Sequence, residues 1–262
     1  MLSNSLDTRT AIFLAAMCSQ SYIQLENGPE SVIMPRNYRM VSSFKATSVL
    51  SEKEFFGFIA ESDSQIVIVF RGTHTTSDWI SDAIARQIQF PYSKEQCLVH
   101  EGFLDIYHSA RKSIVTALNK LSTEKTLYIT GHSLGGALAA LCAADISTNT
   151  KFKNPSVYTY ASPRVGNQAF AILFNRKTGP HYRIYNTNDF VPLLPPFIYR
   201  SPRTDQVYHY MHVKKGVELT YQGGSLSANH AISNYFAELA KLDPRFTQQL
   251  CAKTPGFCPS QG

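Results

Sequence analysis

The sequence predicts an α/β fold in which helices flank a largely parallel central sheet. Strand-like runs alternate with helix-like segments along the 262 residues. The run 66–70 is apolar on both faces, as in a central strand covered on both sides. A short strand at 127–130 leads through a corner of small residues into a helix rich in Ala and Leu. No linker, repeat or low-complexity block interrupts the chain, so we expect one domain, 1–262, with a Pro/Gly/Cys-containing C-terminal tail at 244–262.

The segments before residue 101 predict one helix and a hairpin. Apolar residues recur at three-to-four spacing over 9–25, which predicts a helix that ends at the Asn27-Gly28-Pro29 break. Strand-like sequence occupies 41–61, and residues 54–70 are expected to form a hairpin that places the apolar strand in the sheet.

The segments after residue 100 predict a further series of helices and strands. Residues 101–122 form an amphipathic helix, whose buried stripe contains Phe103, Ile106, Ala110, Ile114, Leu118 and Leu121. The other predicted elements are, in order, a strand at 157–161, a helix near 167–176, a strand at 182–186, an antiparallel pair near 207–221 and a helix from about 230 to 241.

The corner at residues 131–135 has the pattern Gly131-x-Ser133-x-Gly135, which is typical of a nucleophile elbow. A serine at so tight a turn takes strained backbone angles, and glycines on either side remove side chains that would collide with the strand and the helix. An ordinary tight turn would give the same bare pattern. The strand before it and the helix after it favour a nucleophilic Ser133.

A serine hydroxyl needs an adjacent base, and the base needs an acid that holds its tautomer. Asp189 directly follows a predicted strand, where α/β sheets place ligand-facing groups, and an apolar proline-rich loop shelters it. The alternative for Asp189 is a turn-capping role. Asp145 is the competing acid, but it lies on the elbow helix, roughly 18 Å from Ser133 at about 1.5 Å per residue. Asp189 is therefore the expected acid.

Four histidines follow Ser133 and could supply the base. His209 and His212 lie in strand-like sequence, and His181 precedes a strand at the edge away from the elbow. His230 lies in a polar loop before the last helix, from which it can reach the site. His230 is therefore the expected base.

Two backbone N–H groups are candidates for an oxyanion hole, which stabilises the charge of a tetrahedral intermediate. Leu134 begins the elbow helix, and Thr73 follows the apolar strand on the same edge of the sheet. The next segment, 74–84, predicts a short amphipathic helix with Trp79, Ile80 and Ile84 on one face. It is either a surface helix packed on the core or a mobile lid over an apolar cleft. An acyl groove would also be lined by Leu193, Leu194 and Phe197.

The composition excludes several other classes of protein. The 25 Lys and Arg residues give a net charge of +6 but do not cluster, which argues against nucleic-acid binding. No apolar run is long enough to span a bilayer, and the N-terminal residues do not resemble a signal peptide. No His/Cys spacing suggests a metal, and no cofactor is expected. Cys251 could pair with Cys258, or one of them with Cys18, whereas Cys142 is expected to be a buried free thiol.

The chain resembles the class 3 lipases, a family typified by filamentous-fungal triacylglycerol lipases with feruloyl esterase relatives. The resemblance rests on motifs over roughly residues 10–240: Val69-Phe70-Arg71-Gly72-Thr73, Asp78-Trp79, Val99-His100-Glu101-Gly102-Phe103, Thr130-Gly131-His132-Ser133-Leu134-Gly135-Gly136, Ser162-Pro163-Arg164-Val165-Gly166-Asn167, Asn188-Asp189-x-Val191-Pro192 and His230-x-x-x-x-Tyr235-Phe236. The cysteines do not reproduce the fungal disulfide set.

The resemblance implies an α/β-hydrolase fold with a short lid helix at 74–84, a triad of Ser133, Asp189 and His230, and an oxyanion hole of Thr73 and Leu134. It also implies an extracellular location, which the N-terminal sequence leaves open. We expect a monomeric serine carboxylester hydrolase, a lipase acting on acylglycerols at a lipid–water interface. The alternatives are an esterase of small or aromatic (feruloyl-type) esters, a phospholipase A1, and a catalytically silent lipid-binding module on the same fold.

Overall fold

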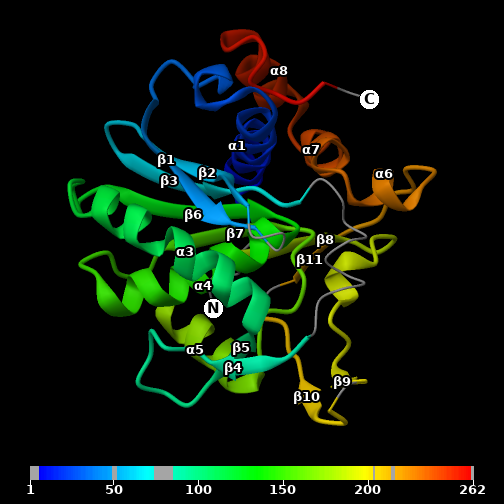
Figure 1. Ribbon diagram of the computed structural model, residues 1–262. Coiled ribbons are helices and arrows are strands. Elements are labelled where there is room, and N and C mark those ends of the chain that lie inside the picture. The colour runs from blue at the N-terminus through cyan, green and yellow to red at the C-terminus, as the bar shows by residue number, and fades with distance from the viewer. Residues whose placement is uncertain (1–5, 49–51, 74–84, 203, 214–215, 261–262) are drawn as a thin grey trace, which may run out of the picture.

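The computed structural model describes residues 6–48, 52–73, 85–202, 204–213 and 216–260. Its main feature is a seven-stranded sheet with the order β1-β2-β3-β6-β7-β8-β11 (Figure 1). The strands are β1 (Arg39–Thr47), β2 (Lys53–Glu61), β3 (Gln65–Phe70), β6 (Thr126–His132), β7 (Ser156–Tyr160), β8 (His181–Asn186) and β11 (Gly216–Leu219). Within this sheet, β3, β6, β7, β8 and β11 are parallel, whereas β1 and β2 are antiparallel to their neighbours. The expected α/β fold with a mostly parallel sheet is therefore confirmed.

Helices cover both faces of the sheet (Figure 1). One face packs against α1 (Thr8–Asn27), α7 (Ile232–Ala240) and α8 (Pro244–Lys253), and the other against α3 (Glu101–Leu118), α4 (Leu134–Asn149) and α5 (Gln168–Lys177). Short elements complete the described chain: η1 (Pro29–Ser31), β4 (Gln87–Gln89), β5 (Leu98–His100), η2 (Val191–Leu193), β9 (Ile198–Arg200), β10 (Val207–His209) and α6 (Leu226–His230). No described helix has the length and apolar character needed to cross a bilayer.

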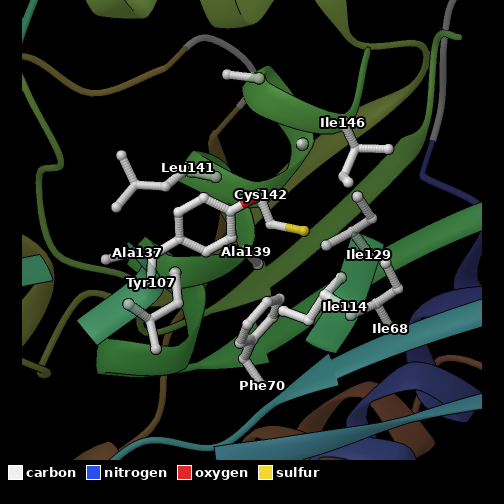
Figure 2. Close-up of a cluster of buried hydrophobic side chains, with 14 of the residues drawn as sticks. Ile68, Phe70, Tyr107, Ile114, Ile129, Ala137, Ala139, Leu141, Cys142 and Ile146 are labelled. Atoms are coloured by element: carbon white, nitrogen blue, oxygen red, sulfur yellow. The ribbon is translucent and has the colours of Figure 1, made fainter. Parts of the chain in front are cut away.

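Strand β3 shows why its sequence is apolar at every position. Ile66, Ile68 and Phe70 belong to the core cluster under α3 and α4, while Val67 and Val69 belong to the cluster under α1. Side chains alternate between the two faces of a strand, so a strand covered on both faces must be apolar throughout. Figure 2 shows the first of these clusters, in which strand side chains meet α3 and α4. The expected 54–70 hairpin is also confirmed, since β2 pairs antiparallel with β3.

One predicted pairing is wrong. The sequence suggested an antiparallel pair near 207–221, but β10 pairs with β9, and β11 pairs in parallel with β8 at the edge of the main sheet. Strand β11 joins the sheet because Val217 and Leu219 pack against the core cluster under α1 and α7. Two strand-like runs that are close in sequence suggest a hairpin. The strand with which each run pairs is instead determined by packing against segments that are distant in sequence.

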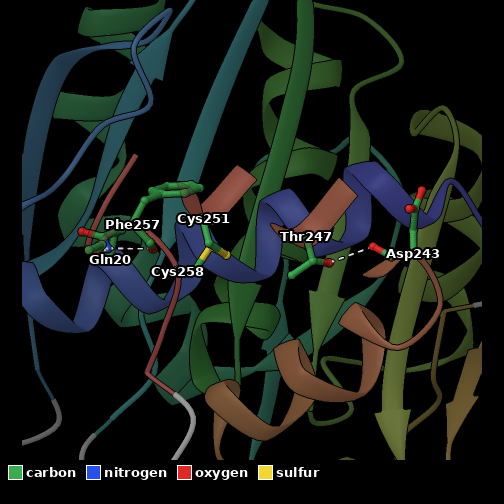
Figure 3. Close-up of a disulfide and its surroundings, with 7 residues drawn as sticks. Gln20, Asp243, Thr247, Cys251, Phe257 and Cys258 are labelled. Carbon is green, nitrogen blue, oxygen red and sulfur yellow. Dashed lines mark hydrogen bonds between the residues drawn. A yellow bond between two sulfur atoms is a disulfide. The ribbon is translucent and has the colours of Figure 1, made fainter. Parts of the chain in front are cut away.

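The C-terminal segment is more ordered than the sequence indicated. Residues 244–253 form α8, and Asp243 caps its N-terminus by accepting a hydrogen bond from the Phe246 N–H over 3.0 Å. Of the pairings left open, the structure contains Cys251–Cys258, and the possible bridge to Cys18 is wrong because Cys18 is a buried free thiol, as is Cys142. Gln20 of α1 donates to the Phe257 carbonyl over 2.9 Å, which ties the segment to α1 (Figure 3).

Candidate active site

Ser133 lies at the sharp turn between β6 and α4, at the carboxyl ends of the parallel strands. Its φ of 56° is in the left-handed region, which a non-glycine residue adopts only when the surrounding structure holds it there. The turn is crowded, because a Cβ added to Gly131 would lie 2.1 Å from the Gly135 carbonyl oxygen. The glycines that flank Ser133 are therefore required by the turn, as the sequence pattern predicted.

Ser133, His230 and Asp189 form a continuous hydrogen-bonded chain. His230 Nε2 lies 2.8 Å from Ser133 Oγ, and His230 Nδ1 lies 2.8 Å from Asp189 Oδ2. All three side chains are buried. His230 is at the end of the short helix α6 rather than in a loop as expected, and Asp189 follows β8. The structure thus brings together three residues separated by up to 97 positions.

The Asp189 carboxylate is held by two further donors. Tyr235 Oη donates to Oδ2 over 2.8 Å, and the Val191 N–H donates to Oδ1 over 3.0 Å. Burial raises the pKa of Tyr235, and the neighbouring Asp189 raises it further, so the phenol stays protonated as a donor. Tyr235 lies in the motif His230-x-x-x-x-Tyr235-Phe236, which by itself does not indicate a role for the phenol. The spacing between Tyr235 and His230 was the only feature of the sequence that could have pointed to the contact between Tyr235 and Asp189.

A second hydrogen-bonded chain links α1 to the backbone of His230. His132 Nε2–H donates to the His230 carbonyl over 2.7 Å, and Tyr22 Oη donates to His132 Nδ1 over 2.6 Å. Burial lowers the pKa of His132 well below its usual value, and the nearby His230 lowers it further, so the imidazole is neutral. A neutral ring that donates from Nε2 must accept at Nδ1, which is the role Tyr22 requires. Sequence reasoning did not identify Tyr22.

The oxyanion-hole candidates lie next to Ser133. Leu134 is the first residue of α4, and Thr73 follows Gly72, which extends from β3. A Cβ added to Gly72 would lie 2.9 Å from Ser133 Cβ, so the backbone there passes directly beside the turn. Trp79, Ile80 and Ile84, like the whole expected lid at 74–84, lie outside the described residues.

The apolar loop after Asp189 presents side chains to the solvent. Leu193 is 61% exposed and Phe197 is 49% exposed, while Leu194 is half-buried. Arg164 supports the loop by donating to the carbonyls of Leu193 and Pro195. These three expected groove residues therefore lie on a segment that starts at the proposed acid.

The competing candidates lie elsewhere. His212 Nε2 donates to the Pro192 carbonyl over 2.6 Å, and burial lowers its pKa to about 3. His181 interacts with Thr178, and His209 is the last residue of β10. Asp145 lies near the C-terminal end of α4, away from Ser133, and forms an ion pair with Arg111 of α3. Among the described residues there is no cluster of His, Cys, Asp and Glu that could hold a metal.

A serine at a strand–turn–helix corner of a mostly parallel sheet, with acid and histidine following in chain order, defines the α/β-hydrolase class. Within that class, the sequence profile of the family described as "Lipase (class 3)" matches residues 67–199, about half of the chain. The protein therefore belongs to the class 3 lipase family.

Individual relatives agree with this assignment. A lipase of Rhizomucor miehei is 37% identical over 142 residues, which cover 52% of this chain and 39% of the relative. A secreted mono- and diacylglycerol lipase of Fusarium solani is 32% identical over 180 residues, covering 64% and 51%. The matches span about half the length of these relatives or less. The crystal structure of a lipase from Rhizopus microsporus var. chinensis superposes with a TM-score of 0.66 at 27% identity, covering 83% of this chain and 75% of that one.

Proposed function

We propose that the protein is a serine carboxylester hydrolase, a lipase acting on acylglycerols, with Ser133, Asp189 and His230 as its triad. The observation that carries the proposal is the chain of two 2.8 Å contacts from Ser133 Oγ through His230 to Asp189. Such a chain turns a weakly nucleophilic hydroxyl into one that can attack an ester carbonyl.

In the proposed reaction, Ser133 Oγ attacks the ester carbonyl while His230 Nε2 takes the hydroxyl proton. The tetrahedral oxyanion is stabilised by the N–H groups of Thr73 and Leu134. His230 then gives the proton to the leaving alcohol, and water hydrolyses the acyl-enzyme by the same steps in reverse order. Asp189 keeps Nδ1 of His230 protonated throughout, and Tyr235 and Val191 keep the carboxylate in place.

The apolar side chains that follow Asp189 in the sequence are suited to binding an apolar acyl chain. Leu193, Leu194 and Phe197 follow the acid, and we propose that they line the acyl groove together with Trp79, Ile80 and Ile84. Exposed apolar side chains beside a site are typical of contact with a lipid surface. The relatives named above are lipases, one of them for mono- and diacylglycerols, which supports acylglycerols over small or aromatic esters or phospholipids.

We also propose that the chain is one monomeric domain. The C-terminal helix α8 and the Cys251–Cys258 loop pack on α1 in the same core cluster as α7. A separate tail would not share that core.

The test is covalent labelling by an organophosphonate, followed by assays with soluble and emulsified esters. Wild-type protein should be labelled at Ser133, and Ser133→Ala should be folded, unlabelled and inactive. A rate increase when the ester exceeds its solubility limit is expected for a lipase, whereas a hyperbolic dependence without such an increase would favour an esterase. A catalytically silent lipid-binding module would not be labelled at all.

A further inference from the structure

The backbone that carries Thr73 is held on both sides by side chains outside the proposed triad. Arg71 Nη1–H donates to the Gly72 carbonyl oxygen over 2.7 Å. The Gly72 N–H donates to Tyr22 Oη over 3.1 Å. Both polar groups of the Gly72 backbone are therefore occupied, one by each side chain.

The Arg71 guanidinium has no freedom to leave this position. It is 2% exposed, and it lies over the Phe56 ring at 3.9 Å. Its Nε–H donates to the Phe55 carbonyl over 2.7 Å, and its Nη2 binds the Glu54 carboxylate. All three guanidinium nitrogens have partners, and a planar group bound at each nitrogen has a fixed orientation.

The order of strands shows in which direction Arg71 orients the peptide group between Gly72 and Thr73. Phe55 and Glu54 belong to β2, which lies on one side of β3, while β6 and Ser133 lie on the other side. The Gly72 carbonyl therefore points towards the β2 side. In a trans peptide the N–H of the next residue points the opposite way. The Thr73 N–H accordingly points towards the β6 side.

The nucleophile elbow lies directly on that side. A Cβ added to Gly72 would lie 2.9 Å from the His132 carbonyl oxygen and 2.9 Å from Ser133 Cβ. A Cβ added to Gly135 would lie 2.6 Å from the Arg71 carbonyl oxygen. With the two backbones this close, an N–H that points away from β2 faces the serine.

We propose that Arg71 is a positioning residue that binds the Gly72 carbonyl and thereby aims the Thr73 N–H at the oxyanion. The proposal rests on the proposed function, because it assigns a role in the same reaction. A peptide turned the other way would present the Gly72 carbonyl oxygen to the oxyanion, which would repel it.

The first measurement is the steady-state kinetics of Arg71→Met with a soluble ester. The loss of one oxyanion donor lowers kcat by about a hundredfold or more, and this is the expected effect, with KM little changed. Affinity for a boronic acid, which forms a tetrahedral adduct with the serine, should fall in parallel with kcat/KM. Arg71→Lys keeps the charge but carries its donors on a single nitrogen instead of a rigid planar fork, so its kcat should lie between those of Arg71→Met and wild type.

Glu54→Gln is the matched control. It removes the ion pair but leaves the Arg71–Gly72 bond, so it should lower the free energy of unfolding while kcat stays close to wild type. If Glu54→Gln and Arg71→Met lose stability and activity to the same extent, or if Arg71→Met binds the boronic acid normally, the proposal is overturned. If Arg71→Met does not fold, the same comparison is made with Arg71→Lys.

Organophosphonate labelling separates this proposal from the proposed function. Ser133 in Arg71→Met should still be labelled to completion but more slowly than in wild type. Labelling at the wild-type rate overturns the role of Arg71 alone. An absence of labelling in wild-type protein overturns the proposed function, and with it the role of Arg71.

Discussion

Two buried aspartates of the described chain, Asp145 and Asp189, lie on different elements and differ in the charge of their partners. Asp145 on α4 is fully buried, and Asp189 after β8 is 3% exposed. Asp145 is paired with a permanent cation, because Arg111 donates to it over 2.6 and 3.0 Å. Within the described chain, the only basic group at ion-pair distance from Asp189 is the imidazole of His230.

Both carboxylates also accept from a tyrosine. Tyr107 donates to Asp145 over 2.5 Å, and Tyr235 donates to Asp189 over 2.8 Å. The charge of Asp145 is compensated at all times, so its network stabilises the contact between α3 and α4. The described partners of the Asp189 carboxylate are neutral hydrogen-bond donors until His230 gains a proton. Asp189 can therefore stabilise an imidazolium that forms during a reaction, which is a property that Asp145 lacks.

The largest difference is expected when each carboxylate is replaced by an amide. Asp189→Asn should lower kcat by about 10⁴-fold, because the amide no longer holds His230 in the tautomer that accepts the serine proton. The rate is measured with a soluble ester and normalised by active-site titration. Asp145→Asn is the matched control and should retain the kcat of wild type for each folded molecule. Equal losses of kcat in the two variants would show that the comparison is wrong.

The next largest effect is expected when Arg111, the ion-pair partner of Asp145, is replaced, and it is an effect on the free energy of unfolding. Arg111→Met leaves Asp145 buried without its partner, and breaking a buried pair in this way costs about 3–5 kcal/mol of unfolding free energy. Denaturant unfolding of the variant and of Arg176→Met, which removes an exposed ion pair with Glu95, measures the difference. Arg176→Met should change the free energy of unfolding by less than about 1 kcal/mol. A loss for Arg111→Met as small as this would mean that Asp145 is held by neutral donors alone.

Local position in the sequence separated these two carboxylates, and the structure places Asp189 at hydrogen-bond distance from His230. Asp145 lies on the elbow helix, too far from Ser133, and Asp189 follows a strand at the edge where parallel strands place functional groups. The side chains that bind these carboxylates could not be predicted from local position. Arg111 is 34 residues from Asp145, and it meets the carboxylate only because α3 packs on α4.

The same distinction explains which parts of the fold could be predicted. Elements rich in apolar residues, such as α1 and the 54–70 hairpin, agree with the sequence because their own residues dictate them. Helix α8 was missed because much of its sequence is polar or charged and none of its residues is buried, so it resembles a solvated tail. Tyr22 was also missed, because it reaches His132 across 110 residues and resembles any other residue of an apolar helix face.

The smallest effect expected concerns the two tyrosines. Tyr235→Phe removes one donor to Asp189 but leaves His230 and the Val191 N–H in place, so kcat should fall by about tenfold, the order expected for one hydrogen bond to a charged group. KM for a soluble ester should stay the same, since Tyr235 is placed behind the acid rather than beside the substrate. Tyr107→Phe makes the equivalent change at Asp145 and should lower the free energy of unfolding while leaving kcat unchanged. Because the two substitutions remove the same hydroxyl from carboxylates of equal burial, any difference in kcat reports whether the carboxylate takes part in the reaction. If Tyr107→Phe lowered kcat as much as Tyr235→Phe, the two networks could not be separated into a structural one and a catalytic one.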